Sequence, residues 1–301
     1  MSVHYKPSLK AAAVWVMCVM AAQAMAGNST KINEQIDASG KVTVAVFERQ
    51  AGSTQQHFND FAVDVPEDFV VVGGGVEGAR LPNGNLLTAS YPNSNLSAWL
   101  VSTKDHITPS PTKLTAWAIG LKIQGLTRQQ LMNYLAVNVS SSGYEQHPDT
   151  AAGIPQGYVL LGGGFRVNWS GMGNLATASY PETAYTWRAR SKDHVAASPA
   201  STQSFAIAIK QSIPNIGTIN TTINSAESSY TQHPSSTANV PAGYALTGCG
   251  AQVNWHGAGN LLWKIQPVTQ GNQHGCTVSS KDHQIVSPAT IRAYAIGIQV
   301  N

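Results

Sequence analysis

The sequence has 301 residues, a formal net charge of +3 and only 11% charged residues. A nearly neutral chain has no broad basic surface, so we expect neither nucleic acid nor an anionic membrane as its partner. The length is sufficient for a sizeable core, built as one large all-β domain or as several small ones.

The chain begins with a segment typical of secretory signal peptides. Lys6 and Lys10 form a basic start, residues 11–22 are mostly apolar, and Ala24-Met25-Ala26 has the small-x-small pattern of a cleavage site. The apolar run is shorter than the about 20 residues that a membrane span needs, although an uncleaved anchor helix is the alternative. We expect a signal peptide over residues 1–26, no membrane span, and a secreted (periplasmic or extracellular) protein with a net charge of +1.

The mature chain, residues 27–301, is expected to be an all-β region of three copies of one unit, at about 41–125, 135–211 and 219–300. Four landmarks recur in the same order, with steps of 86 to 90 residues. They are a Gln-His pair (from Gln56, Gln146 and Gln232), a glycine triplet (73–75, 162–164 and 248–250), an Asn-Leu pair (from Asn85, Asn174 and Asn260) and a Lys-Asp-His tripeptide (from Lys104, Lys192 and Lys281).

Apolar residues alternate with polar or small residues within each copy, as at Phe205, Ile207 and Ile209. This period of two is typical of β-strands with one buried face. Only Thr127–Leu135 has the pattern of a short helix, and the equivalent segments of the other copies do not support one. The expected fold is all-β, with the three repeats in a pseudo-threefold, β-prism-like arrangement; the alternatives are a six-bladed propeller or three small β-domains.

Gly-Gly-Gly (162–164), Ser-Tyr-Pro (179–181) and Ser-Lys-Asp-His (191–194) follow one another in the second copy. In this the chain is similar to secreted bacterial three-repeat proteins that carry the same motifs, a resemblance that covers nearly all of the mature chain and implies no function. The threefold plan also resembles the β-prism architecture of jacalin-type lectins and of the vitelline membrane outer layer protein, in which three sheets are related by internal symmetry.

The Lys-Asp-His tripeptide is the main candidate for a ligand-binding site. Its Asp can accept hydrogen bonds and its Lys and His can donate them, which suits a sugar if an aromatic ring lies nearby. A Trp precedes the tripeptide in the first two copies, whereas Cys276 takes this place in the third. The predicted binding residues are Trp99, Lys104, Asp105, His106, Trp187, Lys192, Asp193, His194, Lys281, Asp282 and His283.

The same tripeptide also has a structural interpretation, namely a corner with a solvated Lys, an Asp that caps the loop and a His packed on Trp or Tyr. The Asp is also a natural partner for the His of the Gln-His pair in the same copy. His106, His194 and His283 have the nitrogen set of a zinc site if a threefold axis passes through them. Equivalent residues more often lie apart on the rim, so we predict no metal and no cofactor.

Cys249 and Cys276 are an even pair in an exported chain, and we predict a disulfide between them. A metal site is disfavoured because neither belongs to a C-x-x-C motif. The glycine triplets lack the residues of a phosphate loop and indicate a close approach of another backbone. Trp169 and Trp255 each follow an Asn and precede a turn, and they are either exposed stacking rings or edges of the core.

The sequence contains no nucleophile elbow, H-E-x-x-H motif or P-loop. Three near-identical sites are unusual for an enzyme but suit multivalent binding. We therefore expect a secreted binding protein that recognises carbohydrate or a cell-surface glycoconjugate through repeated shallow pockets. The alternatives are a structural, matrix or protein-interaction (effector) protein, and a secreted hydrolase with its cleft in the third copy.

Overall fold

The computed structural model describes Met1, residues 28–271 and residues 273–301, so the expected signal peptide lies outside the described residues except for Met1. The described part of the chain is almost entirely β-structure, and the all-β prediction is confirmed. No helix in this part is long and apolar enough to cross a membrane.

The strands follow the three copies in chain order. After β1 (Thr30–Ile36), the first copy contains β2 (Val42–Gln50), β3 (His57–Asp64), β4 (Val70–Glu77), β5 (Leu86–Pro92), β6 (Ala98–Lys104) and β7 (Thr115–Ile123). The second contains β8 (Leu135–Ser141), β9 (Asp149–Gly153), β10 (Tyr158–Asn168), β11 (Leu175–Thr183), β12 (Thr186–Lys192) and β13 (Ser201–Lys210). After β14 (Ser212–Ile213), the third contains β15 (Gly217–Glu227), β16 (Ser235–Asn239), β17 (Ala245–Asn254), β18 (Asn260–Gln270), β19 (Gln273–Asp282) and β20 (Thr290–Val300).

The helix expected near Thr127 is α1 (Arg128–Met132), which connects the first two copies. The Thr127 hydroxyl accepts a hydrogen bond from the backbone N–H of Gln130, and the Gln130 side chain accepts one from the backbone N–H of Thr127. This capping box starts the helix, and the buried Leu131 anchors it to the core.

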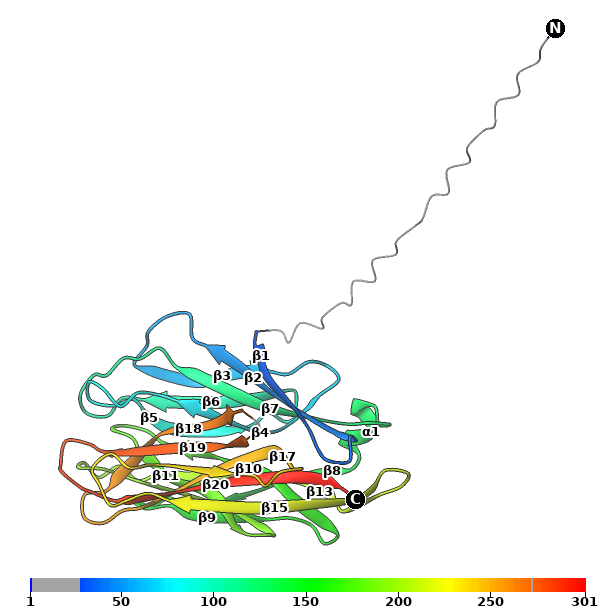
Figure 1. The fold of residues 1–301 in the computed structure, drawn as a ribbon. Coiled ribbons are helices and arrows are strands. Elements are labelled where there is room, and N and C mark those ends of the chain that lie inside the picture. Colours follow the sequence, from blue (N-terminus) through cyan, green and yellow to red (C-terminus); the bar gives the residue numbers. More distant parts are fainter. Residues whose placement is uncertain (2–27, 272) are drawn as a thin grey trace.

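Each copy divides its strands between two sheets. The strand orders are β1-β2-β7-β4-β18-β19-β16, β3-β6-β5-β10-β13-β8 and β14-β15-β20-β17-β11-β12-β9. The first of these sheets joins the first copy to the third, the second joins the first copy to the second, and the last joins the second copy to the third. The ring of copies is therefore closed, and Figure 1 shows the orange strands β18 and β19 of the third copy beside β4 of the first.

This topology confirms the pseudo-threefold arrangement of three sheets. No copy has a sheet to itself, so neither three small β-domains nor a six-bladed propeller describes the fold. One large buried cluster includes Val72, Leu161 and Cys249, one from each copy, so the three sheets also share a core.

The two half-sheets from different copies meet along short ladders, which we call the seams. Each seam contains two residue pairs: Phe165–Ser90 and Arg166–Ala89, Ala178–Gln252 and Ser179–Ala251, and Lys264–Glu77 and Ile265–Val76. Since these ladders are so short, most of the contact between copies comes from side-chain packing at the core and from the bonds described below.

The glycine triplets allow three backbones to meet at the centre of the molecule. The first glycine of each triplet, at 73, 162 and 248, faces the backbone of a neighbouring copy. A Cβ on Gly248 would lie 2.8 Å from the Cα atom of Gly162, closer than real Cβ atoms approach, and the other two glycines are as crowded. The predicted close approach of another backbone is confirmed.

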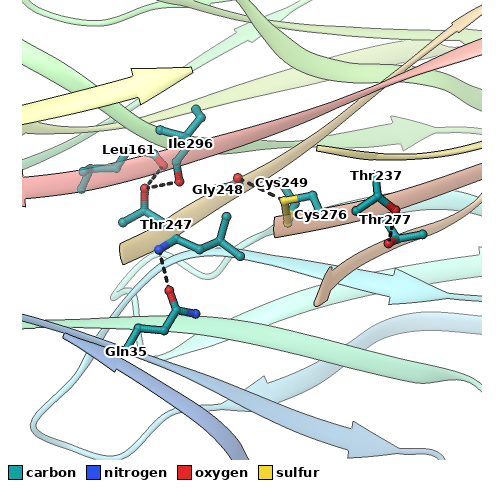
Figure 2. The surroundings of a disulfide bond; sticks show 10 residues. Gln35, Leu161, Thr237, Thr247, Gly248, Cys249, Cys276, Thr277 and Ile296 are labelled. Carbon is teal, nitrogen blue, oxygen red and sulfur yellow. Dashed lines mark hydrogen bonds between the residues drawn. A yellow bond between two sulfur atoms is a disulfide. The ribbon is translucent and has the colours of Figure 1, made fainter. Parts of the chain in front are cut away.

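The middle position of the triplet is filled differently in the third copy. Gly163 leaves room for the indole ring of Trp187, and the first copy has the same arrangement. In the third copy, Cys249 of β17 is bonded to Cys276 of β19. This disulfide, shown in Figure 2, confirms the predicted pairing and joins two sheets across the core.

Candidate functional site

The three Lys-Asp-His tripeptides are largely buried, although Lys192 and Asp193 contribute to the lining of a small hollow of about 290 Å³. Their lysine residues are 3%, 4% and 6% exposed, and their histidines are 0%, 1% and 1% exposed. The expectation of a solvated lysine is therefore wrong. The tripeptides lie at the ends of β6, β12 and β19, where each chain turns into a Pro-containing loop.

The aspartates of the tripeptides hold these loops, as the structural interpretation predicted. The backbone N–H groups of Ser110, Ser198 and Ser287 donate to the Asp Oδ2 atoms at 3.0, 3.2 and 3.3 Å. The other carboxylate oxygen lies 2.8 Å from His57 Nε2 in the first copy. In the second copy this oxygen lies 3.3 Å from His147 Nε2, and in the third copy it lies 3.6 Å from the other ring nitrogen, Nδ1 of His233. The predicted pairing with the His of the Gln-His pair is thus confirmed in every copy.

The buried lysines join neighbouring copies. Lys104 donates to the backbone oxygen of Met172 at 2.8 Å, and Lys192 donates to that of Ala258 at 2.6 Å. Lys281 reaches the first copy in the same way. Burial lowers the pKa of Lys104 to about 8 and lowers the pKa of the other two lysines as well. These lysines act as ties between copies, each satisfied by backbone carbonyl groups.

His106, His194 and His283 meet on the pseudo-threefold axis, and we call them the axial histidines. Their ring centroids are 5.4 to 5.7 Å apart. The Nε2 atom of His106 lies 2.7 Å from the backbone oxygen of His194, and that of His194 lies near the backbone oxygen of His283. Both ring nitrogens of His283 are buried and have no hydrogen-bond partner within the described part of the chain.

The axial histidines converge, contrary to the expectation that they would lie apart on the rim. Their convergence is nevertheless not that of a metal centre, because the nitrogens of His106 and His194 face carbonyl oxygens. Within the described residues, no group of three or more His, Cys, Asp or Glu side chains is placed to hold a metal ion. Burial lowers the pKa of all three histidines, and that of His283 falls to about 3.

The residue after each axial histidine has a left-handed backbone, with φ between 62° and 64°. Two of these residues are the β-branched Ile107 and Val195, for which such a conformation is strained. These turns direct the carbonyls of His194 and His283 toward the axis, where each accepts a hydrogen bond from the axial histidine of a neighbouring copy. Ile107, Val195, Ile285 and Val286 are exposed on these loops and form what we call the axial apex.

Trp99 and Trp187 do not provide faces for a ligand. They are 1% and 0% exposed, and their indole N–H groups donate to the hydroxyls of Ser90 and Ser179 at 2.8 and 2.9 Å. Both rings belong to the core, so the stacking role expected for them finds no free surface. The residues of the predicted pocket thus lie together, but inside the molecule.

Three hollows lie instead beside the seams, and we call them the seam hollows. The first, between copies one and two, has a volume of about 390 Å³ and is lined by residues that include Asp60, Arg166 and Trp169. The second, between copies two and three, has about 430 Å³. The third, between copies three and one, has about 460 Å³. The first two are lined by equivalent positions, whereas the third shares Trp263 and residues 77–81 with this pattern and extends over the first copy to Gln50, Thr112, Lys113 and Thr115.

Each seam hollow is lined by one half-buried tryptophan. Trp169 and Trp255 occupy equivalent positions after β10 and β17. The third hollow has Arg80 at this position, and its ring is Trp263, from the opposite wall. The first two hollows have a threonine at the position of Trp263, so each hollow has a ring although the strand that supplies it changes.

The rings of the first two hollows are held by the tripeptide corners beneath them. Trp169 contacts the His57 ring edge to face, and the Lys104 nitrogen lies 4.7 Å from its centroid. Trp255 is held in the same way, with the Lys192 nitrogen at 4.8 Å. The corners therefore position the rings that line the hollows, which links the repeated tripeptide to the surface indirectly.

Polar side chains complete the lining of the first two hollows. Arg166 lies 3.8 Å from Asp60 in the first, and Arg190 donates to Asp149 at 3.0 Å in the second. The sequence indicated Trp169 and Trp255 as possible surface rings but not these charged residues, which come from different strands and, for Arg166 and Asp60, from different copies. The sequence did contain one indication of the hollows. Trp263 stands where the other copies have a threonine, and it lines the hollow in which Arg80 replaces the tryptophan found at positions 169 and 255.

Comparison with protein-family models and with curated proteins finds no match to the chain. The functional conclusion therefore depends on the geometry of the seam hollows and of the axial apex.

Proposed function

We propose that the protein is a secreted binding protein that recognises carbohydrate or a cell-surface glycoconjugate through the three seam hollows. The observation that carries this proposal is the tryptophan in every hollow, supplied from one wall in two hollows and from the opposite wall in the third. If Trp169 and Trp255 served only to cover the end of their own strands, the third hollow would not need a tryptophan from its opposite wall.

The lining has the chemistry that a sugar requires. An indole face stacks on the apolar face of a pyranose, while carboxylate, amide and guanidinium groups bond its hydroxyls. The first hollow combines Trp169 with Asp60, Arg166 and Asn168. A volume of about 390 to 460 Å³ suits one or two sugar rings, and three open sites of modest affinity gain strength on a surface that presents many glycans.

A glycan array followed by calorimetry tests the proposal. Asn168→Ala and Arg166→Ala alter the rim of the first hollow without removing a core residue, and Gln129→Ala on the exposed face of α1 is the matched control. We expect the two rim changes together to lower the number of sites or weaken binding at least tenfold, and the control to leave binding unchanged. Failure of every glycan to bind the wild-type protein would refute the proposal.

The axial apex supports a second candidate, a protein-interaction role. Ile107, Val195, Ile285 and Val286 are 41%, 57%, 48% and 70% exposed, and Val195 and Ile285 border one small hollow. An exposed apolar patch of this kind is typical of protein contacts. Val195→Asp with Ile285→Asp separates the two candidates, because it would abolish capture of a protein partner and leave glycan binding at the seam hollows intact. The hydrolase alternative gains no support, since the third hollow resembles the other two in size.

A further inference from the structure

The three seam hollows differ in charge. The cation that lines each of the first two is matched by a carboxylate, Arg166 by Asp60 and Arg190 by Asp149. The third hollow is lined by two cations, Arg80 and Lys113, and by one carboxylate. That carboxylate, on Glu77, also lies 3.8 Å from Lys264 across the seam. The third hollow thus has an excess of positive charge that the others lack.

The two cations of the third hollow have exposed side chains with no hydrogen-bond or ion-pair partner among the described residues, so both are available to a ligand. The backbone beside them is well fixed. The carbonyl of Arg80 accepts a hydrogen bond from the buried Lys281 at 2.9 Å, and Gly78 donates to the carbonyl of Trp263 at 2.9 Å. Arg80 therefore projects from a rigid wall rather than from a loose loop.

The ring of Trp263 is a second feature of this hollow. The indole N–H of Trp263 is buried and has no hydrogen-bond partner among the residues that the structure describes, whereas the indoles of Trp99 and Trp187 bond to serine hydroxyls. A buried donor without an acceptor is costly, by about 1–3 kcal/mol. The ring itself lies in the lining with Arg80 and Lys113, so the hollow combines an aromatic surface with two unpaired cations.

We propose that the third seam hollow binds an acidic saccharide, with the carboxylate of a uronic acid held by Arg80 and Lys113. The guanidinium fork matches a carboxylate in two parallel hydrogen bonds, and the ammonium group adds a second charge. The indole of Trp263 provides the wall against which the sugar ring packs, and Glu77 and Gln50 accept bonds from its hydroxyls. The first two hollows, with their paired charges, take neutral sugars. This inference rests on the proposed function and assigns different ligands to its sites.

The test measures binding of a tetragalacturonate and of the matching neutral tetragalactose by calorimetry. Arg80→Gln with Lys113→Gln removes the two free cations. The matched control, Lys31→Gln with Lys122→Gln, removes two lysines that are paired with Glu34 and Asp68 outside the hollows, so the change in net charge is the same. Circular dichroism checks that both variants are folded.

We expect the hollow variant to bind the tetragalacturonate at least tenfold more weakly and to lose most of the salt dependence of binding. We expect the control variant to bind it as the wild type does, and the neutral saccharide to bind all three proteins alike. Equal losses in the hollow variant and the control would overturn the inference, because net charge would then be the cause. Neutral binding with no acidic binding would also overturn it while leaving the proposed function standing, whereas no binding of any saccharide would remove both.

Discussion

The Cys249–Cys276 disulfide takes the place of the glycine and tryptophan that pack together in the other two copies. The loss of stability on its removal can be calculated. The bond closes a loop with a sequence separation of 27 residues. In the chain-entropy model, a loop of this length stabilises the folded state by about 3.5 kcal/mol. With an unfolding entropy of about 2.1 cal/mol/K per residue, Cys249→Ala with Cys276→Ala should lower Tm by about 6–7 °C.

The assay is thermal unfolding followed by circular dichroism, with and without a phosphine reductant. We expect the reduced wild type and the double alanine variant to unfold at similar temperatures, and we expect the variant to be insensitive to the reductant. A Tm that is unchanged within 1–2 °C in both cases would refute the reasoning, because the other contacts between β17 and β19 would then suffice.

The first two copies show what can replace the bond. There a glycine leaves space for a tryptophan, whose indole N–H donates to a serine one strand away. In the third copy the position of that serine is Ile265, which gives the indole no acceptor. Cys249→Gly with Cys276→Trp should therefore recover stability only when Ile265→Ser is added. The difference between the variants with and without the serine should be about 1–3 kcal/mol in urea unfolding, and equal stability of the two would contradict this interpretation.

Three further predictions concern the core and the axis. Gly163→Ala places a Cβ inside the contact distance of the Phe205 backbone oxygen, which cannot move aside; we expect a loss of more than about 3 kcal/mol or no folded protein, measured by urea unfolding or soluble yield. Asn174→Ala leaves two backbone oxygens without the donor that serves them at 2.8 and 3.2 Å, and should cost about 1–3 kcal/mol in the same assay. Acid should destabilise the protein, because burial lowers the pKa of His283 to about 3 and an unfolded histidine takes up its proton near 6.5. The free energy of unfolding should fall as the pH drops below 6.5, and His283 should account for about 3 kcal/mol of this loss at pH 4. The His283→Gln variant should lose less stability between about pH 7 and pH 4 than the wild type.

Much of the architecture could be read from the sequence because it is repeated. The recurrence of four landmarks revealed the copies, period two revealed the strands, and the cysteine that interrupts the third glycine triplet indicated the disulfide. The exchange of strands between copies could not be predicted. Periodicity shows which face of a strand is buried, but β4 pairs with β18 through only two residue pairs, Lys264–Glu77 and Ile265–Val76, which are too few to identify a partner strand from the sequence.

The Lys-Asp-His tripeptide shows where a sequence pattern is ambiguous. Its charged residues suggested a pocket, yet Lys104 and Lys192 are buried because backbone oxygens of the following copy satisfy their ammonium groups. Acceptors on the main chain leave no trace in the sequence. The seam hollows escaped prediction for a related reason, since each is lined by side chains from two copies that are far apart along the chain.

The closed exchange of half-sheets implies that the one-chain form is only one way to build this molecule. A single copy, such as residues 135–211, would carry two half-sheets with open edges, each complementary to the edge that another copy presents. Three separate chains of this kind would complete one another and assemble as a ring of identical subunits, with the axial histidines at its centre. In a single fused chain, the residues that line each seam hollow can be substituted independently of the other two. One hollow can then have unpaired cations while the cations of the other two remain paired with carboxylates.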